Sequence, residues 1–387
     1  PPPPTRTPTP LPPTATATPT PTATPTPTAT PTPVSLHLIL VHDLPPVQAR
    51  ALAEEAATFA AGHAGVTIEV RARADEGRAW HLALGDAALV ADLQAADRLQ
   101  PLDEFLPVAL LDDLAAPARA AATRDGHLWG LADTLGFHLL LFYNRDLIAV
   151  PPAFTDRDRW GLALNSYDPL WVLPWLSACD GWVTDAQGRP TLDTPAMVEA
   201  LTLHAGWHRK PRPVAALATH VEARQYFLDG QAAMLVDGDW AIGELGAVAT
   251  LNWGVAPLPL VGNTSRAAAP LVLGRFWLVP RDLTPPERAA VVDFLSAVAA
   301  PQRQLAWLER FGLLPTHRPA LEEPRVLTDP WWRSSALQMQ AGRVLPLGVD
   351  ANRYLDAMRP PLRALLEGKM TPADAARAMQ RAIEATP

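Results

Sequence analysis

The tryptophans are the residues of this chain that most clearly suggest a chemistry, because the sequence holds 13 Trp but only 4 Tyr. Several of them lie beside Pro, Gly or Asp rather than on a regular apolar stripe: Trp171, Trp175, Trp240, Trp253, Trp277 and the pair Trp331–Trp332. An indole offers a broad, rigid apolar face and one N–H donor. Such a face suits the C–H-rich side of a pyranose ring, while nearby Asp and Arg side chains bond to hydroxyl groups. The alternative is that most of these rings pack in a core or between domains.

Other chemistries find little support in the motifs. No Gly-x-Gly-x-x-Gly follows a predicted strand, and Gly368-Lys369 is followed by Met370 where a phosphate-binding loop needs Ser or Thr. No Gly-x-Ser-x-Gly or His-Glu-x-x-His occurs. His204 and His208 could share a helix face, but no third metal ligand is near in the sequence, and we expect a surface helix there. We therefore predict no cofactor, no metal and no catalytic residue. A glycosidase with two distant carboxylates stays open.

Charge and composition exclude two classes of partner. The net charge is −8, and removing Arg6 with the first 33 residues leaves 31 basic against 40 acidic residues. A nucleic-acid surface would show a basic footprint, and so would a surface that binds anionic membranes by charge. No run of 18 apolar residues occurs, so the sequence predicts no transmembrane helix. The 354 residues beyond Pro33 suffice for two domains with apolar cores, and Cys179 is expected in one of them.

The first 33 residues differ in composition from the rest, because Pro and Thr supply 27 of them. Pro fixes φ and removes amide donors, and such a segment cannot bury enough apolar surface to fold. We predict a disordered tether over residues 1–33 that holds the body away from a surface; a tail without an anchor is the alternative. The chain begins at Pro1 without Met. We therefore expect a removed amino-terminal piece, and a lipid-modified Cys there would anchor the protein to a membrane.

Periodicity predicts the elements that carry these residues. A strand over Val34–Val41 is followed by a helical pattern from Pro45-Pro46 to about His63, and a second strand covers Val66–Val70. This order repeats loosely and predicts an α/β body with mostly parallel strands. Three later helices are predicted to start with Thr as N-cap and Pro at the first helical position: Thr194-Pro195, Thr284-Pro285 and Thr371-Pro372.

A series of motifs over about 220 residues resembles the extracellular solute-binding proteins of ABC importers, the family that includes maltose-binding protein. The segments are Asp97–Asp103, Asp125–Ala132, Leu141–Leu147, Ala178–Gly181, Thr191–Pro195, Phe227–Met234 with Gly238–Trp240, Gly254–Pro259 and Phe311–Thr316. Each is weak alone, and the order and spacing make the series specific. Ala132 stands where the family usually has Pro, and Trp129 stands where it often has Tyr. These departures leave the fold alone and bear on the identity of the ligand.

The resemblance implies two α/β lobes with a hinge and an interlobe cleft, the class II fold of periplasmic binding proteins. Chain order in the family suggests that residues 34–145 and 276–330 form lobe one, and that residues 146–275 and 331–387 form lobe two. It also implies which residues line the cleft. Trp240 is the expected ring-stacking residue, Trp171 and Tyr354 fall near other aromatic positions, and the polar set is Asp43, Asp133, Thr134, Asp168 and Arg275.

The function that the resemblance implies is capture without catalysis. We expect the protein to bind a carbohydrate, in particular an oligosaccharide, and to deliver it to the transmembrane subunits of an ABC permease. The expected place is the extracellular face of the cytoplasmic membrane or the cell envelope, and the expected state is a monomer. Other cargoes stay open: a polyamine, an amino sugar or a glycerol phosphate ester. So do a sensing or adhesive module without an importer, and a glycoside hydrolase or lyase.

Overall fold

The computed structural model describes residues 35–73, 79–148, 160–208, 215–261 and 266–385. The predicted tether over residues 1–33 lies outside the described residues. Among the helices of the described ranges, none is both long enough and apolar enough to cross a membrane.

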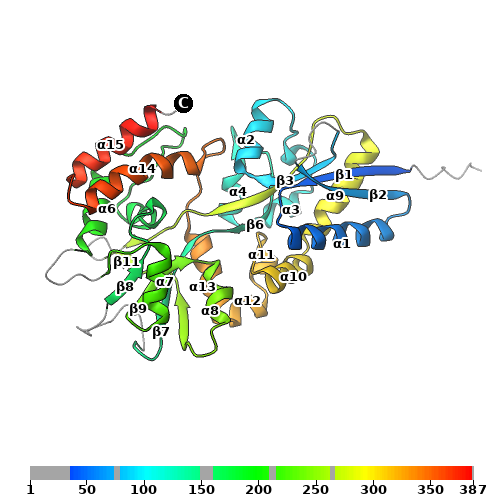
Figure 1. Cartoon of the computed structure of the whole chain (residues 1–387). Coiled ribbons are helices and arrows are strands. Elements are labelled where there is room, and N and C mark those ends of the chain that lie inside the picture. The colour runs from blue at the N-terminus through cyan, green and yellow to red at the C-terminus, as the bar shows by residue number, and fades with distance from the viewer. Residues whose placement is uncertain (1–34, 74–78, 149–159, 209–214, 262–265, 386–387) are drawn as a thin grey trace, which may run out of the picture. The chain divides into compact units, whose positions relative to one another are not determined.

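The first large sheet has the strand order β2-β1-β3-β13-β6 in the described part of the chain (Figure 1). Its strands are β1 (Leu36–His42), β2 (Val66–Ala72), β3 (Leu82–Asp86), β6 (Leu131–Gly136) and β13 (Leu273–Leu278). β1 pairs in parallel with β2 and β3. α1 returns the chain between β1 and β2, as a parallel pair requires. β13 enters from the other half of the molecule and runs antiparallel to both of its neighbours, β3 and β6.

The second large sheet has the order β10-β7-β9-β8 within the same described ranges. Its strands are β7 (Leu139–Asn144), β8 (Trp160–Leu164), β9 (Ala232–Gly238) and β10 (Trp253–Ala256). Only β8 and β9 pair in parallel, while β7 is antiparallel to β9 and β10. The sequence predicted mostly parallel strands, and that expectation was wrong. β7 and β13 each follow a segment that crosses between the two sheets, and each is antiparallel to its neighbouring strands.

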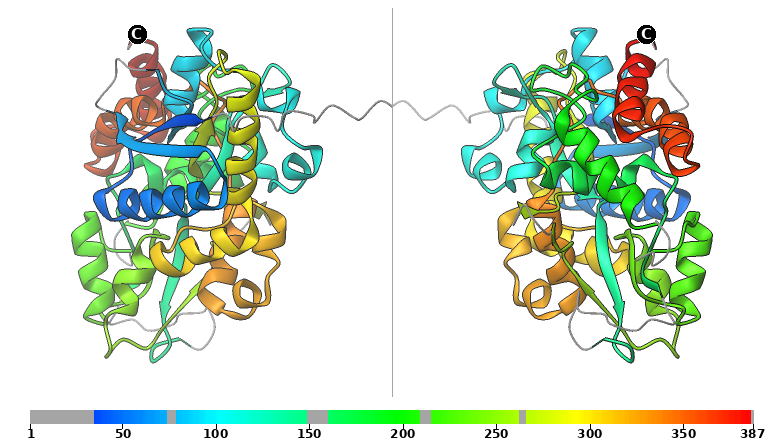
Figure 2. Two further views of the ribbon diagram at one scale, coloured as in Figure 1. Left: turned by 90° about the vertical axis from the view of Figure 1, so that its right-hand side faces the viewer. Right: turned by 90° about the vertical axis from the view of Figure 1, so that its left-hand side faces the viewer.

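Helices cover both sheets, and two short hairpins complete the fold (Figures 1 and 2). Around the first sheet lie α1 (Pro46–Gly62), α2 (Ala87–Ala95), η2 (Leu102–Glu104), α3 (Val108–Asp112), α4 (Ala116–Ala121), α9 (Pro285–Ala299), α10 (Pro301–Phe311), α11 (Arg318–Leu321) and α12 (Pro324–Thr328). With the second sheet go η3 (Pro169–Trp171), α5 (Leu173–Ala178), α6 (Pro195–Gly206), α7 (His220–Leu228), α8 (Ala241–Gly246), α14 (Ala351–Leu366) and α15 (Pro372–Ala385). α13 (Pro330–Ala341) contacts both halves. The hairpins are β4 (Thr123–Arg124) with β5 (His127–Leu128), and β11 (Leu260–Val261) with β12 (Arg266–Ala267).

The predicted Thr-Pro helix starts are confirmed by their hydrogen bonds. The Thr194 hydroxyl accepts from an amide of the first turn of α6 at 3.3 Å. Thr284 and Glu287 form a reciprocal capping box at the start of α9. At the start of α15 the Thr371 hydroxyl accepts from the amide of Asp374 at 3.1 Å. Because each cap satisfies an otherwise unpaired donor, these ends follow from local sequence alone.

The buried apolar side chains group by sheet, which divides the chain differently from the sequence prediction. One cluster takes residues from 38–135 and 272–347, and two others take residues from 139–271 and 345–383. β7 therefore belongs to the second half, although we predicted it in lobe one. α13 contributes Ala336 and Met339 to the first core, although we predicted it in lobe two. Long-range strand pairing and packing decide these boundaries, and sequence distance does not reveal them.

Two of the segments that cross between the halves lie side by side. The amide of Val272 donates to the carbonyl of Arg343 at 2.9 Å, and the amide of Arg343 donates to the carbonyl of Pro270 at 2.8 Å. Gly342 permits this approach, because a Cβ atom there would lie 2.1 Å from a methyl carbon of Val272. The other described crossing runs from Gly136 to Leu139, between β6 and β7. The halves are thus joined by a few short backbone connections.

Candidate functional site

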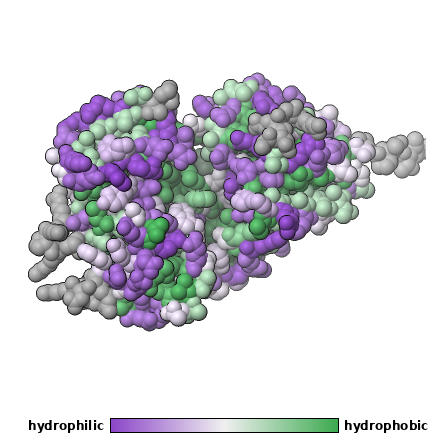
Figure 3. All heavy atoms as spheres, in the orientation of Figure 1, coloured by the Kyte–Doolittle hydropathy of each residue, from purple (hydrophilic) through white to green (hydrophobic). Residues whose placement is uncertain are grey.

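A pocket of about 770 Å³ lies between the two halves. The first half contributes the loop after β1, the ends of β3 and β6, the beginning of β13, and the end of α10 with the residues after it. The second half contributes α8 and the two residues before it. The beginning of α13 and the crossing segment after β6 complete the lining. The space-filling view shows the surface hollowed between the halves, with hydrophobic residues visible in the hollow (Figure 3). The volume is in the range of sites for small molecules.

Polar side chains form one edge of this pocket, where strands of the first sheet end. Asp43 follows β1 and Asp86 ends β3, and the carboxyl ends of parallel strands meet at the same edge. Arg275 of β13 lies in register between Asp86 on one side and Thr134 of β6 on the other. Its Nε donates to Oδ1 of Asp43 at 3.2 Å, with both side chains about a quarter to a third exposed. The edge therefore offers hydroxyl-binding acceptors together with one guanidinium donor.

Aromatic side chains form another part of the lining. Trp240 packs directly against Gly238, where a Cβ atom would lie 2.2 Å from three of its ring carbons. The ring centroid of Phe137 lies 5.8 Å from that of Trp240, with 45° between the ring planes. Trp331 and Trp332 of α13 also line the pocket, and Trp331 is stacked on Trp253 at 4.6 Å. The site thus combines an apolar wall with a polar edge.

Asp239 introduces an unusual carboxyl group into this wall. Its Oδ2 accepts from the amide of Phe137 at 3.1 Å, and burial raises the pKa of Asp239 to about 7. His138 lies close, with Nδ1 at 3.4 Å from the same oxygen, but burial lowers the pKa of His138 to about 3. The imidazole is therefore neutral at pH 7 and supplies no countercharge. Near neutral pH the Asp239 carboxyl changes between its charged and uncharged forms inside the pocket.

Four of the eight predicted binding residues line this pocket together: Asp43, Thr134, Trp240 and Arg275. They come from four separate places in the chain, and both halves contribute. Direct contact of these side chains with a ligand stays a prediction.

Asp133 and Trp171 have internal partners instead. Asp133 is buried, and its Oδ1 accepts from Nη1 of Arg303 at 2.5 Å and from Nε1 of Trp277 at 2.9 Å. It precedes Thr134 on β6, at a point where the register with β13 shifts and leaves Asp133 without a paired residue on β13. Trp171 is 4% exposed, and its indole N–H donates to the carbonyl of Val236 at 2.7 Å. The lining of the pocket includes neither residue.

Asp168 and Tyr354 also lie outside that lining. Asp168 caps η3, accepting from the amide of Leu170 at 3.0 Å, and its second oxygen lies 3.4 Å from Nη2 of Arg359. Tyr354 is 3% exposed, and its hydroxyl donates to the carbonyl of Gly188 at 3.1 Å. Both side chains hold parts of the second half together, and a ligand contact through them stays untested.

Sequence reasoning missed Asp86, Phe137 and Asp239. Asp86 carried a usable signal, since it stands at the carboxyl end of a strand and caps the next helix, close to the place that Asp43 takes after β1. Asp239 immediately precedes Trp240, so the expected ring-stacking position of Trp240 was a signal for Asp239 as well. Phe137 had no signal, because it lies between Gly136 and His138 outside every motif quoted above.

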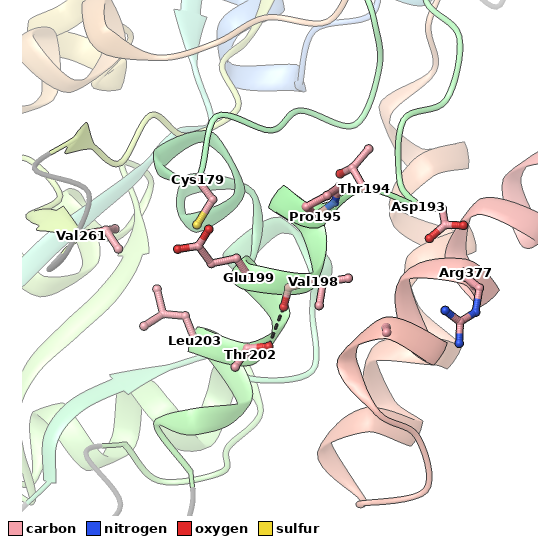
Figure 4. Close-up of a pocket in the computed structure, with 11 residues that line it drawn as sticks. Cys179, Asp193, Thr194, Pro195, Val198, Glu199, Thr202, Leu203, Val261 and Arg377 are labelled. Atoms are coloured by element: carbon pink, nitrogen blue, oxygen red, sulfur yellow. Dashed lines mark hydrogen bonds between the residues drawn. The ribbon is translucent and has the colours of Figure 1, made fainter.

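A second pocket, of about 750 Å³, lies within the second half near α6 and α15 (Figure 4). Val198 and Leu203 of α6 line it, and the hydroxyl of Thr202 donates to the carbonyl of Val198 at 2.7 Å. Cys179 is buried beside it, as expected for a core cysteine, and Arg377 of α15 stands on the other side. None of the predicted binding residues lines this pocket. The pocket between the halves is therefore the stronger candidate.

We expected a surface helix to carry His204 and His208, but His204 of α6 is buried and His208, just beyond that helix, is partly buried. His204 is fully buried, with Nε2 at 2.9 Å from the carbonyl of Ser166, and His208 Nδ1 lies 3.1 Å from the carbonyl of Ala215. Burial lowers the pKa of both imidazoles, that of His204 to about 4. They are neutral, structural side chains at pH 7.

Comparison with known proteins agrees with this architecture. A family model described as bacterial extracellular solute-binding protein matches residues 56–338. The maltotriose-binding protein of Pyrococcus abyssi is 25% identical over 256 residues, which are 61% of this chain and 54% of that protein. The chain therefore spans about half the length of this curated relative.

Solved structures resemble the chain over most of its length. The maltose/maltodextrin-binding domain from Bdellovibrio bacteriovorus, bound to maltotriose, aligns with a TM-score of 0.67 and 25% identity over 90% of this chain and 99% of that one. The cyclic α-maltosyl-1,6-maltose binding protein from Arthrobacter globiformis aligns with a TM-score of 0.74 and 19% identity over 90% and 98% of the two chains. The predicted two-lobe α/β fold is confirmed by these similarities.

Proposed function

We propose that this chain, which belongs to the family of bacterial extracellular solute-binding proteins, captures a carbohydrate between its two halves and delivers it to an ABC permease. An oligosaccharide is the expected ligand, and the protein binds it without chemical change. The similarity to maltotriose- and maltodextrin-binding proteins supports this class of ligand.

The observation that carries the proposal is the composition of the pocket between the halves. Trp240 and Phe137 supply apolar ring faces, and Asp43, Asp86 and Arg275 supply hydrogen-bonding groups at the edge formed by the first sheet. Saccharides present both kinds of surface, because the axial C–H groups of a glucopyranose ring form its faces and the equatorial hydroxyls form its edge. Indole and phenyl faces remove the C–H groups from water, and carboxylates orient the hydroxyls.

Charge in the pocket favours a neutral ligand over a phosphate ester. Asp43, Asp86, Asp239 and Glu309 line it against Arg275 and Arg310. Arg275 is paired with Asp43, and Arg310 lies 3.3 Å from Glu54. An anion would therefore compete with carboxylates already in place. A polyamine or an amino sugar would suffer no such repulsion and is the second candidate.

The mechanism follows from the short connections between the halves. A ligand that contacts both walls favours the arrangement in which the walls are close, and so shifts the population toward a closed form. Closure removes water from the pocket and strengthens each remaining hydrogen bond. The permease then recognises the closed form.

The direct test is titration calorimetry with maltotriose, glucose, spermidine and glycerol 3-phosphate. Trp240→Ala should weaken maltotriose binding by at least about 1.5 kcal/mol, because it removes the aromatic face and its buried area.

Trp129→Ala is the matched control. Trp129 lies outside the pocket lining, and its N–H donates to the carbonyl of Arg124. Its loss should leave the affinity unchanged. The carbohydrate proposal would be overturned if the protein bound spermidine and no saccharide, or if it bound none of these compounds.

We also propose that the protein works as a lipid-anchored monomer outside the cytoplasmic membrane. The description of the family supports the extracellular location, and the Pro- and Thr-rich stretch supports a tether. Detergent-dependent release of the protein from the membranes of cells expressing the complete gene would support anchoring, and recovery in the soluble fraction without detergent would contradict it.

A further inference from the structure

Phe137 occupies an unusual place and an unusual backbone conformation. It lies in the crossing segment between β6 of the first sheet and β7 of the second, and 56% of its surface is exposed. Its φ is 57°, in the left-handed region that residues with a Cβ atom seldom adopt. An exposed phenyl ring and a disfavoured backbone conformation both lower the stability of the fold. Another interaction must therefore stabilise Phe137 in this conformation.

Asp239 supplies that interaction from the second half. Its carboxylate accepts from the amide of Phe137 at 3.1 Å, and its own amide donates to the carbonyl of His138 at 3.0 Å. Gly136 completes the arrangement, because a Cβ atom there would lie 2.6 Å from Oδ2 of Asp239. Asp239 thus holds the crossing segment at two backbone groups, the amide of Phe137 and the carbonyl of His138.

The position that results directs Phe137 into the pocket beside Trp240. The two ring planes are inclined by 45°, so the rings form a bent apolar surface rather than a parallel stack. No hydrogen bond or core contact accounts for the exposed ring, since Phe137 belongs to none of the buried clusters of the described residues.

We propose that Phe137 is a further ligand-contacting and specificity-determining residue, and that Asp239 is the positioning residue that presents it to the ligand. This inference rests on the proposed carbohydrate function of the same pocket. The ligand would bury the exposed phenyl face against a sugar ring next to the one that covers Trp240. Because the ring is attached to the crossing segment, this contact lies at the place where the two halves move relative to each other.

Titration of maltotriose into Phe137 variants tests the contact. Phe137→Ala should weaken binding about tenfold, and Phe137→Leu should weaken it less, because it keeps part of the apolar area. Two controls separate the other effects. Val221→Ala truncates a side chain that is 77% exposed outside the pocket, and Asp125→Gly relaxes a φ of 53° outside the pocket. Neither control should change the affinity.

A double-mutant cycle tests the role of Asp239. Asp239→Ala should weaken binding, and Asp239→Asn should weaken it less, because the amide oxygen still accepts from Phe137. The double variant Phe137→Ala/Asp239→Ala should bind maltotriose no more weakly than whichever single variant binds it less tightly. Both changes remove the same contact, between the Phe137 ring and the ligand. If Asp239→Ala does not fold, Asp239→Asn takes its place in the cycle.

The outcomes are distinct. Unchanged affinity of Phe137→Ala, with normal binding by the unmodified protein, would overturn this inference and leave the proposed function standing. Additive losses in the cycle would overturn the positioning role of Asp239. Failure of the unmodified protein to bind any saccharide would overturn the proposed function and this inference together.

Discussion

At the scale of single residues, Asp239 shows how burial changes the chemistry of a common side chain. The carboxyl group accepts from backbone amides, among them that of Phe137, and it lies beside a neutral imidazole. It has no cation in the contacts that the described residues make with it. Desolvation therefore dominates, and it raises the pKa of Asp239 from 3.8 to about 7. A ligand hydroxyl would meet either an acceptor or a donor at this position, depending on pH.

This raised pKa predicts a pH-dependent stability. Between about pH 4 and 7 the folded protein holds a proton on Asp239 that the unfolded chain has released. The contribution of this carboxyl to the free energy of unfolding is therefore lost as the pH rises through 7. Asp239→Asn cannot titrate, so its melting temperature relative to the unmodified protein should rise from pH 5 to pH 8.

Thermal unfolding at pH 5, 6.5 and 8 measures this difference. The buried imidazoles of His138, His204 and His317, whose pKa values burial lowers to about 3 to 4, act in the opposite direction and destabilise the fold on acidification. His204 and His317 bond to groups other than Asp239, so their contributions cancel in the comparison. His138 lies beside Asp239, but its pKa of about 3 keeps it neutral throughout the tested range. A constant offset between the two melting curves across this range would contradict the expectation.

At the scale of elements, Asp133 connects β6, β13 and α10. Its carboxylate is 1% exposed and is shared by Arg303 of α10, itself 8% exposed, and by the indole N–H of Trp277. Arg303 also pairs with Glu55 of α1 at 2.9 Å. Removing one partner of a buried pair leaves an uncompensated charge, which is the costly part.

We expect Asp133→Ala to lower the free energy of unfolding by about 3 kcal/mol, with little change in saccharide affinity. Urea unfolding and titration calorimetry measure the two quantities separately. Asp356→Ala is the control, because its ion pair with Arg359 lies on the exposed surface of α14 and should contribute less than about 1 kcal/mol. A selective loss of affinity with unchanged stability would instead support the direct ligand contact that the sequence suggested for Asp133.

At the scale of the whole molecule, the site exists only because two halves meet. The polar edge comes from the first sheet and Trp240 from the second half, so a ligand that bridges them stabilises their approach. The few short crossing segments leave this motion open, while the cores of the halves stay intact.

Two measurements should report this closure. Saturating maltotriose should reduce the radius of gyration measured by small-angle X-ray scattering. At a hundred times the dissociation constant it should also add about 2.7 kcal/mol to the free energy of unfolding. Trp240→Ala at the same concentration should show smaller effects. A thermal shift without any change in scattering would indicate a site that is formed before the ligand arrives.

Local sequence determined much of this protein. Helix starts such as Thr284-Pro285, the strand that became β1 and the ordered family motifs depend on neighbouring residues, so they could be predicted without a structure. The placement of Asp43, Trp240 and Arg275 at the site followed from the resemblance, and their common pocket agrees with it.

The tertiary structure decided the rest. Strand register set Arg275 between Asp86 and Thr134, and core packing covered Trp171, although its sequence context resembled that of Trp240. A left-handed backbone at a crossing segment exposed Phe137 to the pocket. These outcomes depend on pairings between residues at least 65 positions apart, and the burial of a side chain is a property of such pairings rather than of its neighbours in the chain.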